Sequence, residues 1–191
     1  MRPSIKSLRQ LPNVLTLIRL FASPFLAWLL LKGQFRQALG LVLLASVTDW
    51  LDGFTARKLR ISNPAGVFLD PMADKVMLVT LFVVLAAIHL ISGWMLGLVL
   101  GRDLVIVSGA GLLRVFRGYH RFLPSTLGKV STFFQIVLVF LVLTRAAYPY
   151  RLLLWLEMLA VALCAIFTAL SGLDYIRRGI EMTRRPQGAI R

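Results

Sequence analysis

Residues 48–75 read TDWLDGFTARKLRISNPAGVFLDPMADK, and this stretch holds four of the eight acidic residues of the 191-residue chain. Apolar runs lie on both sides of it, so it should contain the end of one helix, a short loop and the start of the next. Asp49 and Asp52 are spaced i, i+3, and Asp70 and Asp74 are spaced i, i+4, so each pair falls on one helix face. The short loop predicts antiparallel neighbouring helices that bring both acidic pairs to the same depth.

Long apolar runs fill most of the remaining chain. Hydrophobic residues make up 58% of it and the mean hydropathy is +0.79, which is high for a surface that faces water. Crossing a membrane takes roughly 20 mostly apolar residues, and continuous runs favour helices over a barrel. We predict an all-α integral membrane protein with one domain over residues 1–191. Its six transmembrane helices are expected at about 13–31, 36–52, 68–90, 94–113, 126–144 and 152–175.

Lys and Arg are distributed unevenly between the predicted loops. The first twelve residues, MRPSIKSLRQLP, are basic but lack the apolar core of a signal peptide, so we expect a short juxtamembrane segment. Fourteen Lys and Arg fall on that side of the membrane and four on the other, which predicts cytoplasmic termini. The net charge of +14 lies beside apolar spans, which indicates lipid head groups rather than nucleic acid as partners. We expect an inner-membrane protein with its acidic cluster at the cytoplasmic face.

The acidic cluster predicts a metal site. Four carboxylates at one depth repel one another strongly at the low effective dielectric of a membrane interface, and either protonation or a bound cation must relieve this. A ligand set of oxygens without His or Cys favours a hard ion, Mg²⁺ or Mn²⁺, and such ions suit chemistry on a pyrophosphate. The alternative is four separately solvated aspartates. We predict a metal site formed by Asp49, Asp52, Asp70 and Asp74.

The acidic pairs belong to a longer pattern, D-x₂-D-G-x₂-A-R-x₈-G-x₃-D-x₃-D, within residues 49–74. This pattern resembles the signature of the CDP-alcohol phosphotransferase family at all of its eight fixed positions, and the six-span layout is similar too. The fixed positions are Asp49, Asp52, Gly53, Ala56, Arg57, Gly66, Asp70 and Asp74.

Members of that family transfer a substituted phosphate group from a CDP-linked donor to a hydroxyl group and release CMP. The resemblance implies that Asp49, Asp52 and Asp70 bind a pair of metal ions. It implies that Asp74 is a shared ligand or the base that deprotonates the acceptor, and we favour the base. A homodimer and a CDP-diacylglycerol donor are also implied. The residues implied to line the cytidine and pyrophosphate site are Gly53, Ala56, Arg57 and Gly66.

The start of the first span, LPNVLTLIR (11–19), resembles phosphatidylglycerophosphate synthases and eukaryotic-type cardiolipin synthases of this family. Asn13, Thr16 and Arg19 lie at i, i+3 and i+6, roughly one polar stripe on an apolar helix. A helix cap and a backbone hydrogen bond are the alternative roles of Asn13 and Thr16. A charge within a span normally has a function. We predict Asn13 and Thr16 at the donor site and Arg19 at the acceptor site.

Further cations within or beside spans predict the site for the acceptor. Arg102, Lys129 and Arg114 are expected to form a phosphate pocket between the fourth and fifth spans. Arg102 could instead pair with Asp103 or with a carboxylate of the 49–74 stretch. Arg102, Asp103 and Arg114 resemble the cardiolipin synthases, because glycerophosphate-using members usually carry the second arginine a turn earlier, at Ala110 here.

The C-terminal segment SGLDYIRRG (171–179) indicates the other acceptor, glycerol 3-phosphate, because it resembles the glycerophosphate-using members. We expect sn-glycerol 3-phosphate as acceptor, with phosphatidylglycerol as the alternative and inositol phosphate or serine behind both. A transporter is the alternative from another class of protein. It predicts charges spread through the bilayer midplane, whereas most acidic residues here cluster at one interface.

Overall fold

The computed structural model describes two sets of residues: the backbone of 21–59, 66–117 and 125–184, and the side chains of 21–48, 74–109, 111 and 125–181. Within these ranges every regular element is a helix, as predicted, and no strand occurs. The chain forms two compact units, which are described separately. They comprise residues 1–90 with 143–149, and residues 91–142 with 150–191.

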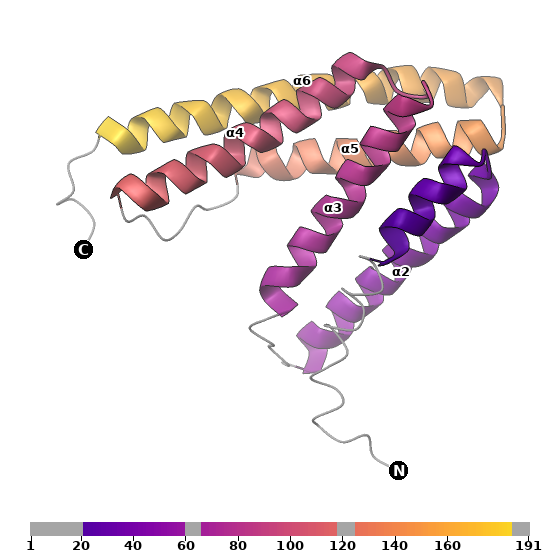
Figure 1. The fold of residues 1–191 in the computed structure, drawn as a ribbon, viewed down its shortest axis with the longest axis horizontal. Helices are drawn as coiled ribbons and strands as arrows, with labels where there is room; N and C mark the ends of the chain where they lie inside the picture. The colour runs from indigo at the N-terminus through magenta and orange to yellow at the C-terminus, as the bar shows by residue number, and fades with distance from the viewer. Residues whose placement is uncertain (1–20, 60–65, 118–124, 185–191) are drawn as a thin grey trace, which may run out of the picture. The chain divides into compact units, whose positions relative to one another are not determined.

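The first unit begins with a helical hairpin (Figure 1). Its turn is a Schellman motif, in which Gly33 adopts a φ of 72°. The Gly33 N–H bonds the Leu30 carbonyl at 3.0 Å, and the Gln34 N–H bonds the Leu29 carbonyl at 2.9 Å. Glycine suits this position because it adopts the left-handed conformation without steric cost. The helices of the unit are Phe21–Leu31, α2 (Phe35–Leu59) and α3 (Gly66–Ala87), joined by the last residues of α5.

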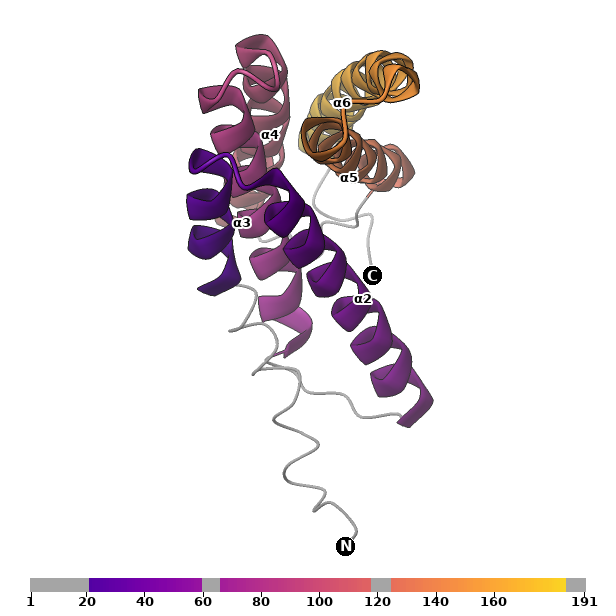
Figure 2. The same cartoon turned by 90° about the vertical axis from the view of Figure 1, so that its right-hand side faces the viewer.

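Helices α2 and α3 run in opposite directions. The C-terminal end of α2 and the N-terminal end of α3 lie at the same end of the unit in both views (Figures 1 and 2). Residues 60–65 connect Leu59 to Gly66. A connection of this length spans at most about 25 Å. This is the antiparallel arrangement expected from the sequence.

Helix α3 ends at Ala87, three residues before the predicted end of its span. His89 adopts the left-handed conformation with a φ of 60°, which costs a residue other than glycine about 1 kcal/mol. The N–H groups of His89 and Leu90 bond the carbonyls of Ala86 and Leu85 at 3.1 and 2.9 Å. The same helix-ending motif as at Gly33 therefore stops α3, and hydropathy does not report it.

The second unit contains α4 (Gly93–Arg117), most of α5 (Thr126–Ala147) and α6 (Arg151–Arg184). Helix α4 packs along α6. Between α5 and α6, the rings of Phe134 and Phe167 stack with centroids 4.9 Å apart. The fully buried apolar side chains in this unit include Met95, Val99, Leu138 and Cys164.

Helices α2, α4, α5 and α6 are all longer than their predicted spans, and α2 and α6 exceed them most. Helix α2 continues to Leu59 rather than residue 52, and α6 continues to Arg184 rather than residue 175. Hydropathy shows where the apolar surface of a helix ends. The helix itself continues as long as each backbone N–H bonds the carbonyl four residues earlier. In α6 the extension carries two i, i+4 ion pairs of 2.9 Å, Asp174–Arg178 and Arg177–Glu181.

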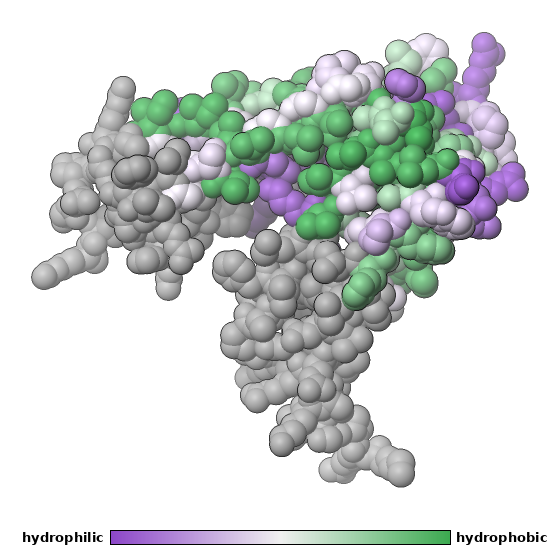
Figure 3. Space-filling view, in the orientation of Figure 1, coloured by the Kyte–Doolittle hydropathy of each residue, from purple (hydrophilic) through white to green (hydrophobic). Residues whose placement is uncertain are grey.

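Among the described residues, two helices are long and apolar enough to cross a membrane, Thr126–Ala147 and Arg151–Glu181. Only 22% of the most apolar part of the second is buried within the protein, whereas the core helix of a soluble protein is mostly buried. Exposed hydrophobic residues are also frequent on the described parts of α4 and α6 (Figure 3). These features are those of a membrane protein. Six spans and cytoplasmic termini stay predictions.

Candidate active site

The signature residues lie on the end of α2 and the start of α3. Because α2 extends to Leu59, the first five fixed positions occupy i, i+3, i+4, i+7 and i+8 of one continuous helix, which form a single stripe. The last three occupy i, i+4 and i+8 of α3, again one stripe. The whole pattern is therefore two helix stripes at the same end of the first unit (Figures 1 and 2). The α2 positions are Asp49, Asp52, Gly53, Ala56 and Arg57, and the α3 positions are Gly66, Asp70 and Asp74.

The structure corrects the sequence prediction at the end of the second span. With a span ending at residue 52, Gly53, Ala56 and Arg57 would have belonged to a loop. They are instead helical, in register with Asp49 and Asp52. The spacing of the motif follows from this, because a donor that contacts one helix face meets residues three and four positions apart.

The side chains of Asp49, Asp52 and Asp70 lie outside those that the structure describes, and that of Asp74 is exposed. Among the described side chains there is no group of three or more His, Cys, Asp or Glu that could hold a metal. That search does not cover the predicted site. An oxygen-only set on two helix ends at the same end of the unit fits a hard divalent ion, and the metal site remains a prediction.

Three predicted residues near the N-terminus, Asn13, Thr16 and Arg19, lie outside the described residues. Arg114 is on α4, but its side chain is not among those described. Lys129 is exposed in the first turns of α5. The predicted acceptor pocket can thus be followed only at Arg102 and Lys129.

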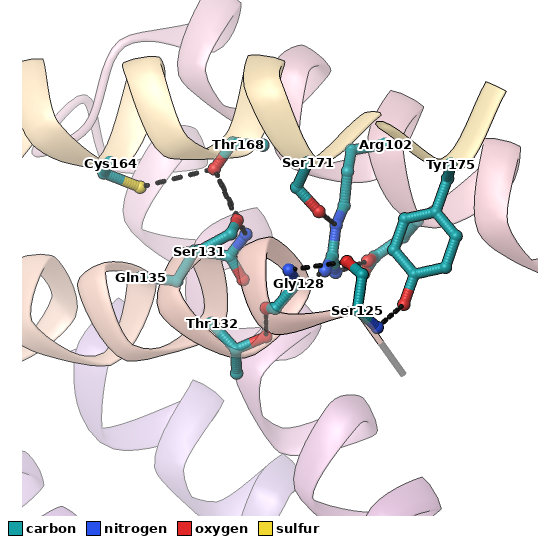
Figure 4. A network of polar contacts seen from close by, with 11 residues as sticks. Arg102, Ser125, Gly128, Ser131, Thr132, Gln135, Cys164, Thr168, Ser171 and Tyr175 are labelled. Atoms are coloured by element: carbon teal, nitrogen blue, oxygen red, sulfur yellow. Dashed lines mark hydrogen bonds and ion pairs between the residues drawn. The ribbon is translucent and has the colours of Figure 1, made fainter. Parts of the chain in front are cut away.

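Arg102 is the best-defined of the predicted site residues, and its guanidinium joins three helices (Figure 4). Nη1 donates to Oδ1 of Asp103 at 2.8 Å, and Nε donates to Oγ of Ser171 on α6 at 3.2 Å. Nη2 donates to the carbonyl of Gly128 on α5 at 3.2 Å. The Tyr175 ring lies 5.9 Å from the guanidinium carbon, within cation–π range. We call Arg102, Asp103, Ser125, Gly128, Ser171 and Tyr175 the Arg102 cluster.

The ion pair between Arg102 and Asp103 was one of the alternatives left open by the sequence, and it is present. This ion pair does not occupy all of the N–H groups of the guanidinium. The three bonds take one N–H from each nitrogen, so a second N–H on Nη1 and on Nη2 contacts no further group in the described part of the chain. Arg102 therefore retains two N–H groups that no bond to a described residue occupies, and its charge is partly neutralised by Asp103.

The first turn of α5 is fixed to α6 within the same cluster. Ser125 caps α5, because its Oγ accepts the Gly128 N–H at 2.9 Å. The Ser125 N–H donates in turn to Oη of Tyr175 at 3.1 Å. The next residue after Gly128, Lys129, is thereby held on a turn with two side-chain anchors. Arg102 and the turn that bears Lys129 lie in the same unit, and the acceptor pocket stays a prediction.

Four members of the cluster were missed as contacts from the sequence. Ser171 and Tyr175 were noted only for a resemblance, although their i, i+4 spacing already places them on one face of a helix. Ser125 directly before an apolar run is a capping signal. Nothing in the sequence marks the Gly128 carbonyl as a partner of Arg102.

A second polar network lies between α5 and α6, further along these helices than the Arg102 cluster. Ser131 and Thr168 share a hydrogen bond of 3.0 Å, and Nε2 of Gln135 lies 3.3 and 3.4 Å from their hydroxyl oxygens. All three side chains are fully buried. They satisfy one another without a charge, so this network stabilises the packing of α5 on α6.

A shallow pocket of about 250 Å³ lies in the first unit, between the start of α2 and the end of α5. Arg36 lines it, with Nε 3.5 Å from the Ala147 carbonyl and its guanidinium carbon 5.1 Å from the centre of the Tyr148 ring. None of the predicted site residues lines this pocket.

Comparison with known proteins identifies the class to which this fold and signature belong. The sequence profile of the CDP-alcohol phosphatidyltransferases matches residues 9–169, which include the whole signature. The chain belongs to the CDP-alcohol phosphatidyltransferase family. This confirms the resemblance inferred from the eight fixed positions.

Relatives of two kinds are similar to the chain. A CDP-diacylglycerol–glycerol-3-phosphate 3-phosphatidyltransferase of Aquifex aeolicus is 33% identical over 175 residues, covering 90% of this chain and 96% of the relative. A chloroplastic protein of the same description from Oryza sativa subsp. japonica is 32% identical over 146 residues, covering 68% of this chain and 44% of the relative. A cardiolipin synthase (CMP-forming) of Homo sapiens is 30% identical over 185 residues, covering 88% and 61%. The chain thus spans less than two thirds of the rice and human proteins.

Proposed function

We propose that this protein is a phospholipid-synthesising enzyme that transfers a phosphatidyl group from CDP-diacylglycerol to the hydroxyl group of an alcohol and releases CMP. The observation that carries the proposal is the family match over residues 9–169, together with the complete signature on two helix stripes. The full-length similarity to the Aquifex aeolicus transferase supports it further.

Asp49, Asp52, Asp70 and Asp74 would hold the divalent metal, Mg²⁺ or Mn²⁺, and two ions are expected. When bound, such ions neutralise the pyrophosphate and stabilise the charge that develops on the departing CMP. Asp74 would take the proton from the acceptor hydroxyl, which is a poor nucleophile near neutral pH. Its exposed side chain is compatible with access by an acceptor.

The remaining signature residues would bind the donor. Gly53, Ala56 and Gly66 carry small side chains or none, so their helix stripes allow a ligand close to the backbone. Arg57, on the same stripe as Gly53, would pair with a phosphate oxygen. Asn13 would complete the donor site together with Thr16.

For the acceptor we propose sn-glycerol 3-phosphate, bound by Arg102, Lys129, Arg114 and Arg19. Its support is the similarity to the Aquifex aeolicus glycerol-3-phosphate enzyme along almost its whole length. The two remaining N–H donors of Arg102 suit phosphate oxygens.

One observation favours a second candidate, phosphatidylglycerol, which would make the protein a cardiolipin synthase. The partial neutralisation of Arg102 by Asp103 leaves less positive charge for a phosphomonoester, and a phosphodiester needs less. The similarity to the human cardiolipin synthase agrees with this alternative.

We further propose a homodimer in the inner membrane with its active site at the cytoplasmic face. The orientation is supported by the excess of Lys and Arg in the loops on the side of the signature, and the homodimer rests on the family resemblance alone. The family is one of membrane proteins, in agreement with the apolar helices α5 and α6.

The decisive experiment incubates purified protein in mixed micelles with CDP-diacylglycerol and Mg²⁺ or Mn²⁺. Glycerol 3-phosphate, phosphatidylglycerol, inositol phosphate and serine are offered separately, and CMP and the lipid product are measured. We expect CMP release that depends on glycerol 3-phosphate, with phosphatidylglycerophosphate as product. Cardiolipin formation would select the second candidate. Ion flux in liposomes without any CMP release would overturn the enzymatic proposal.

A further inference from the structure

Tyr175 contacts two separate parts of the second unit from a buried position on α6. Its ring lies beside the Arg102 guanidinium, at 5.9 Å, and its Oη accepts the backbone N–H of Ser125 at 3.1 Å. One side chain therefore connects an arginine of α4 to the residue that caps α5 (Figure 4).

The contacts of Tyr175 close a ring of interactions. From Tyr175 they pass to Ser125, from the Ser125 hydroxyl to the Gly128 N–H, and from the Gly128 carbonyl to Arg102. The ring returns from Arg102 to α6 through the Tyr175 face and through Ser171, one helical turn away. A shift of any one member would move the Arg102 guanidinium relative to the first turn of α5.

The space inside the ring is filled. A Cβ atom at Gly128 would lie 3.1 Å from Nη2 of Arg102 and 3.2 Å from both Oγ of Ser125 and Oη of Tyr175. Gly172 on α6 has the Arg102 stem 3.9 Å from its Cβ position. The Arg102 side chain thus has a glycine on two sides, with Gly128 beside its guanidinium and Gly172 beside its aliphatic stem.

We propose that Tyr175 and Ser171 are positioning residues for the acceptor's phosphate group. They hold the Arg102 guanidinium and the α5 turn bearing Lys129 at a fixed separation. Both cations can then bind one phosphate group without a further loss of conformational entropy at that step. The inference rests on the proposed function, in which these two cations bind the acceptor. Neither Tyr175 nor Ser171 touches a substrate; each acts through Arg102 or the α5 cap.

The packing of α5 on α6 does not depend on these two side chains alone. The bond between Ser131 and Thr168 and the stacked rings of Phe134 and Phe167 join the same helices further along. Removal of the Tyr175 hydroxyl should therefore leave the unit folded while it loosens the Arg102 cluster.

The test compares two variants with matched controls in the full-length protein. Tyr175→Phe removes the Oη that holds Ser125 but keeps the ring, and its control is Tyr150→Phe at an exposed tyrosine. Ser171→Ala removes the oxygen that holds Nε of Arg102. Its control is Ser131→Ala, which removes another fully buried hydroxyl between helices that does not contact Arg102. For each variant, the KM of acceptor, the KM of CDP-diacylglycerol, kcat and the unfolding temperature are measured.

We expect Tyr175→Phe and Ser171→Ala each to raise the acceptor KM by about three- to tenfold, the effect of one lost hydrogen bond. The donor KM should stay within about twofold of the unaltered protein. Ser131→Ala should lower the unfolding temperature without this selective change, and Tyr150→Phe should change neither. An unchanged acceptor KM in Tyr175→Phe and Ser171→Ala would overturn the inference, as would an equal rise in Ser131→Ala. If the unaltered protein releases no CMP with any acceptor, the proposed function fails, and the inference with it.

Discussion

Arg102 and Asp103 are neighbours in the sequence and form an ion pair across 2.8 Å, with side chains only 9% and 12% exposed. Consecutive residues of a helix point about 100° apart, so their long side chains must bend toward each other to meet. The pair places a nearly neutral unit in the middle of an apolar helix, and it lowers the net positive charge at Arg102.

Asp103→Asn tests that charge directly. Asparagine keeps an oxygen that can accept from Arg102 but removes the negative charge, so Arg102 should attract a dianionic phosphate more strongly. We expect the KM for glycerol 3-phosphate to fall relative to that for phosphatidylglycerol. The matched control is Glu181→Gln, at an exposed carboxylate paired with Arg177. An unchanged ratio of the two KM values would show that Asp103 does not influence the choice of acceptor.

Arg102→Ala should raise the KM for acceptor by roughly ten- to hundredfold, because it removes charge-assisted hydrogen bonds to phosphate. Arg102→Lys should recover only part of this, since an ammonium cannot contact Asp103, Ser171 and Gly128 in three directions at once. Steady-state kinetics with each substrate varied in turn give the measurement. A rise confined to the donor KM would move Arg102 to the other half of the site.

Asp74→Asn should reduce CMP release about a hundredfold or more, because the amide is a weaker metal ligand and cannot act as a base. The side chain is exposed, so the variant should remain folded and membrane-inserted. Size-exclusion chromatography and thermal unfolding check folding, and Glu181→Gln again serves as the carboxylate control. Turnover at the unaltered rate would remove Asp74 from the list of site residues.

Chelation of divalent ions should abolish CMP release, and added Mg²⁺ or Mn²⁺ should restore it. The expectation follows from the four carboxylates of the signature, which require a cation in order to lie together. Titration of metal into chelator-treated protein, with CMP release and metal binding followed in parallel, measures the effect. Full activity without metal would contradict the proposed site.

Gly128→Ala should raise the acceptor KM and lower the unfolding temperature, since its Cβ would crowd three polar atoms at 3.1–3.2 Å. Overpacking of this kind typically costs ~1–3 kcal/mol. Gly97→Ala on α4, where nothing lies within 4 Å of the added atom, is the control and should be neutral or stabilising. Equal behaviour of the two variants would mean that the Arg102 cluster accommodates the methyl group.

The sequence predicted the all-helical fold and most helix positions, because apolar runs of membrane length leave few alternatives. The start of α5 at Thr126 agrees with the predicted span. Helix ends were harder to predict. His89 stops α3 through its backbone conformation, and the ion pairs of Arg177 and Arg178 accompany α6 beyond its apolar surface. Neither effect leaves a trace in hydropathy.

The signature could be recognised from the sequence, whereas the contacts of the Arg102 cluster could not, for a similar reason. The signature is local in the sequence, so its helical spacing can be recognised from the order of the residues alone. The Arg102 cluster depends on residues from three helices, with Ser171 lying 69 positions beyond Arg102. Contacts at that separation follow from tertiary packing, which a single sequence does not reveal.

The order in which the chain is synthesised gives the Arg102–Asp103 pair a further significance. Helix α4 leaves the ribosome well before α6, so Ser171 and Tyr175 have not yet been synthesised when α4, a predicted span, would insert. An isolated arginine at the centre of a helix opposes insertion by ~2.5–3.5 kcal/mol. Asp103 is the one partner of the cluster that is synthesised together with Arg102, so the predicted span would insert with its charge neutralised before α6 is made.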